Sequence, residues 1–456
     1  MKNKTKTLDI QEFLHGRFVL DCPKIELTPY ARSSKKATLN GSGYISRCKD
    51  GTFDLKVYFQ KPLSVDEVFE GLNWKAGKVI AEDAYYNLKA YELSGAVWEA
   101  GRFIPNKKTG PDMSMIEGKV PELSRKEEDY RGSEKERIQF YFNKIIKVPL
   151  NTVVREQETV GNTTRKMKSD IRLARFAASS IDFEVEENEG HTKLSAISDA
   201  VEFKEVLINR IFEAFCFVTS NSTSWSTLVI KSKGLRETRI RAVNPDTQES
   251  RIQPPIEFRR YQTTDSVWRL FDCYLKYVLL NGVDYFHPLS KLIFSVIESG
   301  KVSLDVEALI LSVSIESLLM EEMSTLFKVS AELTKNICVA IDLVQKSEVM
   351  DEKFKKRVVG TFSAMKNVRA KDILFALRDK DLIDKDVVKT CLDLRNKSTH
   401  GGKNSGADFQ NHLNRVSAVL VLFYQLLFLV IKYEGEYTDY GTYDYPTMQF
   451  SGKLPY

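Results

Sequence analysis

The chain has 456 residues, of which 43% are hydrophobic and 28% are charged, and 67 Lys and Arg against 62 Asp and Glu give a net charge of +5. This composition is ordinary for a folded protein of two or three domains and excludes wholesale disorder. The small positive excess permits nucleic-acid binding without requiring it, so such binding depends on local basic clusters. The scattered cysteines, none in a CxxC pair, argue against a zinc site and favour free thiols in a reducing cytoplasm.

Residues 16–255 show a hydrophobic period of mostly two. In residues 52–59 the odd positions are apolar and the even ones mostly polar, and Asp50-Gly51 just before them is a hairpin turn signal. Further short strands are predicted at residues 96–98, 138–142, 181–186 and 228–230. The pattern predicts a β-rich, sandwich-like domain over residues 1–255. The sequence has no Walker loop and no GxGxxG motif, which argues against an ATP or NAD cofactor.

Two features interrupt this β-rich region. Residues 198–218 have a helical spacing of Leu207, Ile211 and Phe215, which predicts a helix packed on the sheet. A basic cluster follows, with Lys231, Lys233, Arg236, Arg239, Arg241, Arg251, Arg259 and Arg260. Arg236, Arg239 and Arg241 are candidates for tracking an RNA backbone. A solvated strand face explains the same charges equally well, because charge patterning does not show where side chains point.

Pro254-Pro255 marks the predicted domain boundary, because every clear pattern beyond it has a helical period. Short loops between the candidate helices predict an antiparallel bundle over residues 256–435, so the whole chain is predicted to be α+β. Helices are expected at residues 265–280, 288–299, 306–323, 330–347, 351–366, 371–378, 384–399 and 408–433. The Tyr-rich residues 436–456 are predicted to form an irregular tail, whose tyrosines could dock on a neighbouring surface.

Residues 416–431 are almost all apolar. They fall short of the roughly 20 residues that span a bilayer, include Ser417 and Gln425, and follow a charged, amphipathic stretch. We therefore expect a central core helix and no membrane association. A membrane span is the alternative, and solubility without detergent distinguishes the two.

Residues 392–402 combine side chains suited to phosphate chemistry. The apolar stripe of residues 387–394 predicts an amphipathic helix, and Arg395 falls where that stripe should continue. Asn396 and His400 lie four residues apart on one helical face, and two glycines end the helix directly after His400. Arg binds phosphate oxygens, His moves a proton near neutral pH, and Asn orients a substrate group. By spacing alone, a solvated helix end is the commoner explanation.

The sequence Arg395-Asn396-Lys397-Ser398-Thr399-His400 resembles the R-polar-xxx-H motif of HEPN-domain ribonucleases, and it similarly precedes the last long helix. Residues 306–323, with Glu316, resemble the first bundle helix of that family, which often carries an acidic residue facing the motif. Near the other end, residues 16–18, 41–45 and 51–55 are similar to the N-terminal domain of the ApeA group, HEPN proteins of bacterial anti-phage defence.

This resemblance implies a cytoplasmic, metal-independent endoribonuclease that needs no cofactor and cuts cellular RNA, with tRNA among the candidates, in abortive infection. Arg395 would stabilise charge on the phosphate, His400 would move protons, and Asn396 and Glu316 would orient these groups. Lys397 would help to bind RNA. One motif supplies one histidine and cleavage needs two proton transfers, so the resemblance implies a homodimer formed through the helical domain.

The β-rich domain would then sense a phage-derived trigger or restrain the nuclease. A rival hypothesis is a HEPN-like module that has lost activity and serves dimerisation or partner binding, against which the intact Arg395 and His400 weigh. A membrane-linked effector using residues 416–431 is a second rival. Among the other histidines, His412 in the charged opening of the last helix is the one nearest the motif region in sequence.

Overall fold

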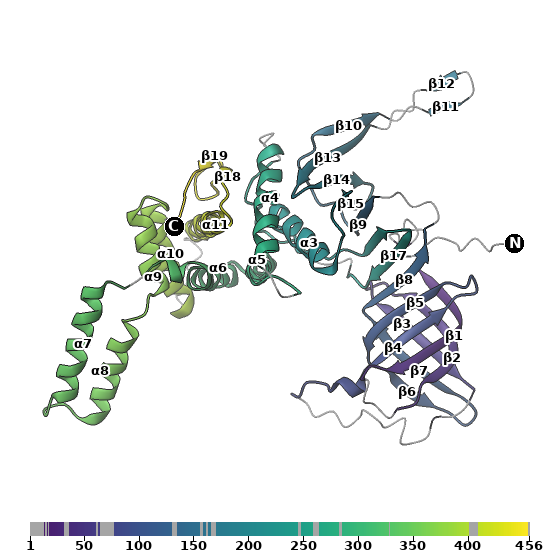
Figure 1. Ribbon diagram of the computed structural model, residues 1–456, viewed down its shortest axis with the longest axis horizontal. Coiled ribbons are helices and arrows are strands. Elements are labelled where there is room, and N and C mark those ends of the chain that lie inside the picture. The colour runs from purple at the N-terminus through teal and green to yellow at the C-terminus, as the bar shows by residue number, and fades with distance from the viewer. Residues whose placement is uncertain are drawn as a thin grey trace. The chain divides into compact units, whose positions relative to one another are not determined.

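The computed structural model divides the chain into two compact units (Figure 1). The β-unit contains Met1–Ile208 and Thr223–Gln248, and the helical unit contains Asn209–Ser222 and Glu249–Tyr456. The structure describes residues 13, 16, 18–31, 36–60, 63, 77–129, 135–155, 158–160, 163–165, 170–244, 248–258, 264–281, 285–327, 329–400 and 409–454; within these ranges, side chains are not described for residues 154–172, 264 and 396–400.

The β-unit is built on one antiparallel sheet of 15 strands, in the order β10-β13-β14-β15-β9-β16-β17-β8-β5-β4-β1-β2-β3-β7-β6. The strands are β1 (Val19–Pro29), β2 (Leu39–Arg47), β3 (Phe53–Phe59), β4 (Tyr86–Tyr91), β5 (Val97–Phe103), β6 (Asn106–Thr109), β7 (Ser114–Val120), β8 (Glu122–Glu128), β9 (Glu136–Phe142), β10 (Thr152–Arg155), β13 (Asp170–Ala178), β14 (Ile181–Asn188), β15 (His191–Ser198), β16 (Thr227–Ser232) and β17 (Leu235–Arg241). A separate ribbon pairs β11 (Glu158–Val160) with β12 (Thr163–Arg165).

This sheet corrects the predicted sandwich. Pairing of β9 with β16 and of β17 with β8 joins the N-terminal strands to the later ones through backbone hydrogen bonds, so one sheet continues where two were expected. Strand alternation shows which residues face a core but not which strands pair, and the pairing decides between one sheet and two. The α+β class itself is confirmed, because helices dominate the chain beyond this sheet.

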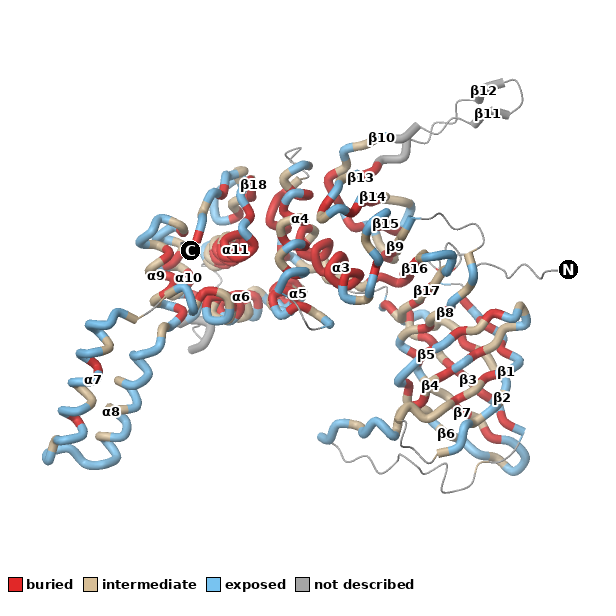
Figure 2. The backbone as a smooth tube through the Cα atoms, viewed as in Figure 1, coloured by how far each residue is buried: buried red, intermediate tan, exposed pale blue. Residues whose placement is uncertain are grey.

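The strands β1–β8 enclose an aromatic core. Phe53, Leu55 and Val57 of β3 are buried and alternate with less buried neighbours, as their period of two predicts (Figure 2). The turn before β3 is also as predicted, since Gly51 has φ +82 and β2 pairs antiparallel with β3. A Cβ on Gly51 would lie 1.8 Å from the Val243 carbonyl oxygen, so both the turn and the packing require glycine.

Helix α3 (Glu205–Thr219) was predicted to pack on the sheet, but from Asn209 onward it belongs to the helical unit. Arg210 and Glu213 are both buried, and their Nη1 and Oε1 atoms lie 2.6 Å apart. The Ser290 hydroxyl of α5 (Pro288–Ser299) also donates to Glu213, at 2.5 Å. Buried charges are tolerated only when they are paired and hydrogen-bonded. Arg210 pairs with Glu213, and the Ser290 hydroxyl adds a hydrogen bond to it.

The rest of the helical unit follows the predicted helices closely. They are α4 (Thr264–Leu280), α5, α6 (Leu304–Leu318), α7 (Ala331–Lys346), α8 (Glu352–Ala364), α9 (Ala370–Asp379), α10 (Lys385–His400) and α11 (Phe409–Ile431). A π-helical turn, η2 (Leu319–Met323), and a 3₁₀ turn, η3 (Ser324–Leu326), follow α6. Helices α6, α10 and α11 pack against one another, while α7 packs against α8.

Helix α11 is long and apolar enough to cross a membrane by length and composition. In the structure, most of this helix is buried inside the protein. It contacts α4, α6 and α10, so it lies at the centre of the helical unit. This packing explains its apolar sequence as that of a core helix.

The predicted irregular tail contains a small hairpin of β18 (Gly435–Thr438) and β19 (Thr447–Phe450). Tyr437 and Phe450 are buried, and the Tyr440 hydroxyl donates to the Pro254 carbonyl at 2.8 Å. Apart from this hairpin, the described part of the tail has no regular secondary structure. These aromatic rings supply a core that short strands lack in isolation.

Candidate functional site

Helix α10 positions the central residue of the predicted motif. Its N-terminus is capped by Asp384, whose Oδ1 accepts from the backbone amides of Asp386 and Val387 at 2.8 and 3.0 Å. Val388, Cys391 and Leu394 form its buried stripe; Arg395, seven residues beyond Val388, continues on the same side. The buried stripe fixes the rotation of α10, and this rotation directs Arg395 toward its neighbouring helix.

The structure brings two of the predicted catalytic residues together. Nη2 of Arg395 on α10 lies 2.7 Å from Oε2 of Glu316 on α6, at the distance of a charge-assisted hydrogen bond. Their side chains are 46% and 44% exposed. An ion pair this open contributes at most about 1 kcal/mol to folding, so the fold does not depend on it. Glu316 therefore orients the guanidinium, while nearly half of the Arg395 side chain stays exposed to solvent.

Glu316 lies close to an irregularity in its own helix. Regular α6 ends at Leu318, and the π-helical turn η2 begins at the next residue. Such turns are rare in helices and are frequent at functional sites, because they re-aim side chains on either side. Val313, three residues before Glu316, is exposed.

The other motif residues lie at the end of α10. The helix extends to His400, as its sequence predicted, but the side chains of Asn396, Lys397 and His400 lie outside the described residues. The convergence of His400 and Asn396 with Arg395 therefore stays a prediction.

His412 of α11 contacts a different part of α6. Its Nε2 lies 3.1 Å from Oδ1 of Asp305, in the first turn of α6. Asp305 and Glu316 are eleven residues apart, which is about 16 Å along a helix at 1.5 Å per residue. Arg415, one turn beyond His412, lies 3.7 Å from Asp393 on α10.

A buried carboxylate lies near His412. Glu307 of α6 is 6% exposed and lies 3.4 Å from Nη2 of Arg251. Burial raises the pKa of Glu307, while Arg251 and the charge of His412 act in the opposite direction. These contacts were not evident in the sequence, because they join residues far apart along the chain.

The thiol next to the motif is shielded. Cys391 is buried one turn before Arg395, and burial raises its pKa to about 12. A thiol in this state is a poor nucleophile, so the chemistry of α10 rests on its polar residues.

The predicted RNA-binding arginines of β17 are held by carboxylates. Nη1 of Arg239 lies 2.8 Å from Glu205, and its Nε lies 2.7 Å from Glu237. Arg241 lies 2.9 Å from Glu122, and Arg236 lies 3.6 Å from Glu127. The guanidinium of Arg241 also lies 3.8 Å above the Trp225 ring. These contacts neutralise the cluster, which favours a structural role over tracking of an RNA backbone; RNA binding by β17 stays a prediction.

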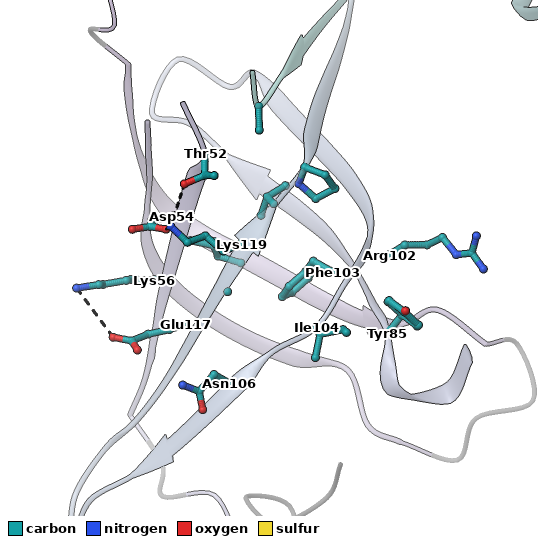
Figure 3. Close-up of a pocket in the computed structure, with 15 residues that line it drawn as sticks. Thr52, Asp54, Lys56, Tyr85, Arg102, Phe103, Ile104, Asn106, Glu117 and Lys119 are labelled. Atoms are coloured by element: carbon teal, nitrogen blue, oxygen red, sulfur yellow. Dashed lines mark hydrogen bonds and ion pairs between the residues drawn. The ribbon is translucent and has the colours of Figure 1, made fainter. Parts of the chain in front are cut away.

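The β-unit contains a cleft of about 900 Å³ beside β3, β5 and β7 (Figure 3). Its lysines face carboxylates: Lys119 lies 2.6 Å from Asp54, and Lys56 lies 4.0 Å from Glu117. Phe103 and Ile104 lie near each other in the view and add apolar surface to the lining. With Arg102, the lining has three cations against two carboxylates, so its net charge is small. A small net charge and an apolar wall suit a small molecule of low charge better than a polyanion.

Among the residues that the structure describes, no group of three or more His, Cys, Asp and Glu side chains could hold a metal ion. In comparisons with known proteins, no family model, curated protein or solved structure matches this chain.

Helix α8 carries a basic group that the sequence-based predictions do not include: Lys353, Lys355, Lys356 and Arg357 fall within five residues. This run of basic residues was visible in the sequence.

Proposed function

We propose that the chain is a metal-independent endoribonuclease of the HEPN type, which cuts cellular RNA in anti-phage abortive infection in the cytoplasm. The observation that supports this most directly is the exposed Arg395–Glu316 pair, at 2.7 Å, within the motif that resembles that family. Glu316 fixes the guanidinium without burying it, so the cation is pre-oriented for a phosphate.

RNA cleavage by this route uses the substrate's own 2′-hydroxyl as the nucleophile. A base removes the 2′ proton, the oxygen attacks phosphorus, and an acid protonates the departing 5′-oxygen. Arg395 stabilises the charge that develops on the phosphate oxygens, and His400 performs one of the proton transfers. Asn396 orients the phosphate or His400. The products are a 2′,3′-cyclic phosphate and a free 5′-hydroxyl.

A homodimer formed through the helical unit would place two copies of the motif at one cleft and supply the second histidine. Light scattering on an active preparation tests this, and a dimer is expected. Active protein that is monomeric at assay concentration would contradict the shared site.

The β-unit is proposed to restrain the nuclease until a phage-derived trigger binds. The cleft near Phe103 is a place in this unit where a small trigger molecule would fit. Ile104 also lines the cleft and is only partly buried, so Ile104→Ala alters its wall while leaving α10 untouched. Changed toxicity with unchanged stability supports regulation from the cleft, whereas unchanged toxicity under infection argues against it.

The deciding experiment incubates wild type and His400→Ala with total cellular RNA, with and without EDTA. Wild type is expected to release fragments with cyclic phosphate ends in both conditions, and His400→Ala to release none. Full cleavage by a well-folded His400→Ala protein would refute the proposed mechanism. Loss of cleavage on chelation, restored by Mg²⁺, identifies a metal-dependent chemistry instead. A folded, dimeric wild type that cuts no RNA supports the inactive-module hypothesis.

A further inference from the structure

Helices α7 and α8 form an antiparallel hairpin within the helical unit (Figure 1). Ser330 caps α7 and Asp351 caps α8, each by accepting from a backbone amide three residues on. Helix α8 has no buried residue, and in α7 only Ile337 and Val344 are buried. Figure 2 shows both helices in mostly exposed and intermediate colours. The hairpin therefore presents much of its surface to a partner.

The outer surface of α8 carries a row of cations. Lys353, Lys356 and Arg357 are exposed, and their spacing of three and four residues places them on one helical face. Among the described residues, these three have no carboxylate within ion-pair distance, whereas the neighbouring Lys355 pairs with Glu352 at 3.1 Å. Gly360 continues this row, and a Cβ built there meets nothing within 4 Å. The row is thus both charged and open to close approach.

The position of these cations in the helix is unfavourable for stability. All three lie in the first two turns of α8, where the helix dipole presents its positive end. Cations are favoured at the opposite end, yet the last turn of α8 has no basic residue. Folding of the hairpin does not call for this arrangement, so an anionic partner is the better explanation of it.

An aromatic ring lies beside the cations. Phe354 is 50% exposed and directly follows Lys353 in the first turn. Positive charge next to an open aromatic ring is the usual surface for single-stranded nucleic acid, in which phosphates meet cations and bases stack on the ring. A membrane-binding helix would need a broad exposed apolar face, but Val358 and Phe362 of α8 are already partly covered.

We propose that the α8 face formed by Lys353, Phe354, Lys356 and Arg357 binds the backbone of single-stranded RNA and presents it to the nuclease site. The proposal rests on the proposed ribonuclease function for its biological role, but binding at this face is measurable without cleavage. It assigns substrate capture to the hairpin and not to β17.

The test uses the full-length protein and a fluorescein-labelled single strand of 2′-O-methyl RNA, which cannot be cut because it lacks the 2′-hydroxyl. Fluorescence anisotropy gives the Kd across a range of salt concentrations. Three phosphate contacts predict that the triple variant K353E/K356E/R357E has a log–log salt slope shallower by about 2 and binds about 100-fold more weakly near 0.1 M salt. The variant should not melt earlier, since Glu is favoured near a helix N-terminus.

The matched control K49E/K78E/K204E changes the net charge equally at exposed lysines outside the hairpin. It should retain the wild-type slope, and the charge-conserving K353R/K356R/R357K should bind as wild type does. Phe354→Ala should weaken binding without changing the slope, because stacking releases no counterion.

An unchanged slope in K353E/K356E/R357E, or an equal loss in both charge-reversed triples, overturns the proposal. Wild type that binds phosphatidylglycerol vesicles but not the RNA also overturns it and assigns the face to a lipid surface. Cleavage of unmodified RNA by wild type is measured separately. If wild type binds RNA through α8 but does not cleave it, the assignment of the binding face holds and the proposed ribonuclease function is refuted.

Discussion

Arg239 on β17 and Arg395 on α10 are each held by a glutamate at hydrogen-bond distance, but in different surroundings. Arg239 contacts two carboxylates and is 19% exposed, whereas Arg395 contacts Glu316 and is 46% exposed. The cations Lys353, Lys356 and Arg357 of α8 are exposed, with no carboxylate near them among the described residues. A basic residue enclosed by carboxylates supports the fold, whereas a basic residue that stays largely exposed can also meet a ligand.

The sharpest test of this difference is Arg395→Ala. We expect at least a 100-fold loss of RNA cleavage, as for removal of one electrostatic group from a transition state, with little change in melting temperature. Denaturing gels of total RNA and differential scanning fluorimetry measure the two effects. Arg175→Ala is the matched control, because Arg175 also lies 2.7 Å from a glutamate, Glu184, on an exposed surface. Equal activity in both variants would contradict the assignment of Arg395.

Arg239→Ala should show the opposite behaviour. Removing this guanidinium leaves Glu205 and Glu237 facing each other without their cation, so we expect a loss of about 2 kcal/mol in the free energy of unfolding. Urea denaturation measures this loss. RNA binding per folded molecule should keep its salt slope, because the guanidinium is already neutralised. A shallower slope with unchanged stability would restore β17 as an RNA-binding surface.

Glu316→Gln tests whether the exposed pair matters by orientation or by charge. The amide still accepts a hydrogen bond from Arg395 but no longer carries charge, so we expect a loss of about tenfold in cleavage, smaller than for Arg395→Ala. Glu316→Ala should lose more than Glu316→Gln in kcat. If both variants cleave like wild type, Glu316 is a bystander on the helix surface.

The smallest effect concerns the buried Glu307. Burial raises its pKa above the ordinary 4.5, so the folded state retains the proton to a higher pH than the unfolded state. Its contribution to stability is therefore full below pH 4.5 and is lost as the pH rises through the raised value. Glu307→Gln cannot titrate, so its stability should not fall with pH in this way. Melting temperatures of the two proteins across this window should diverge as pH rises; parallel curves would show that Glu307 titrates normally.

Local features of this fold were predictable from sequence because they depend on near neighbours. The period of two in β3, the turn at Gly51 and the helices of the C-terminal half follow from alternation, turn chemistry and caps. The burial of α11 was also predictable, since its length and flanking charges favour a core helix. The motif Arg395 to His400 was visible as a spacing on one helix.

The tertiary structure decided which distant residues meet. Pairing of β9 with β16 and of β17 with β8 made one sheet where two were predicted, and the residues of α3 after Ile208 joined the helical unit. The tertiary structure also decided which basic residues are neutralised by carboxylates. Three arginines of β17 and three cations of α8 look alike in sequence, but Glu122, Glu127 and Glu205 reach only the first group. Electrostatic energy falls steeply with distance and exposure, and sequence specifies neither for residues far apart in the chain.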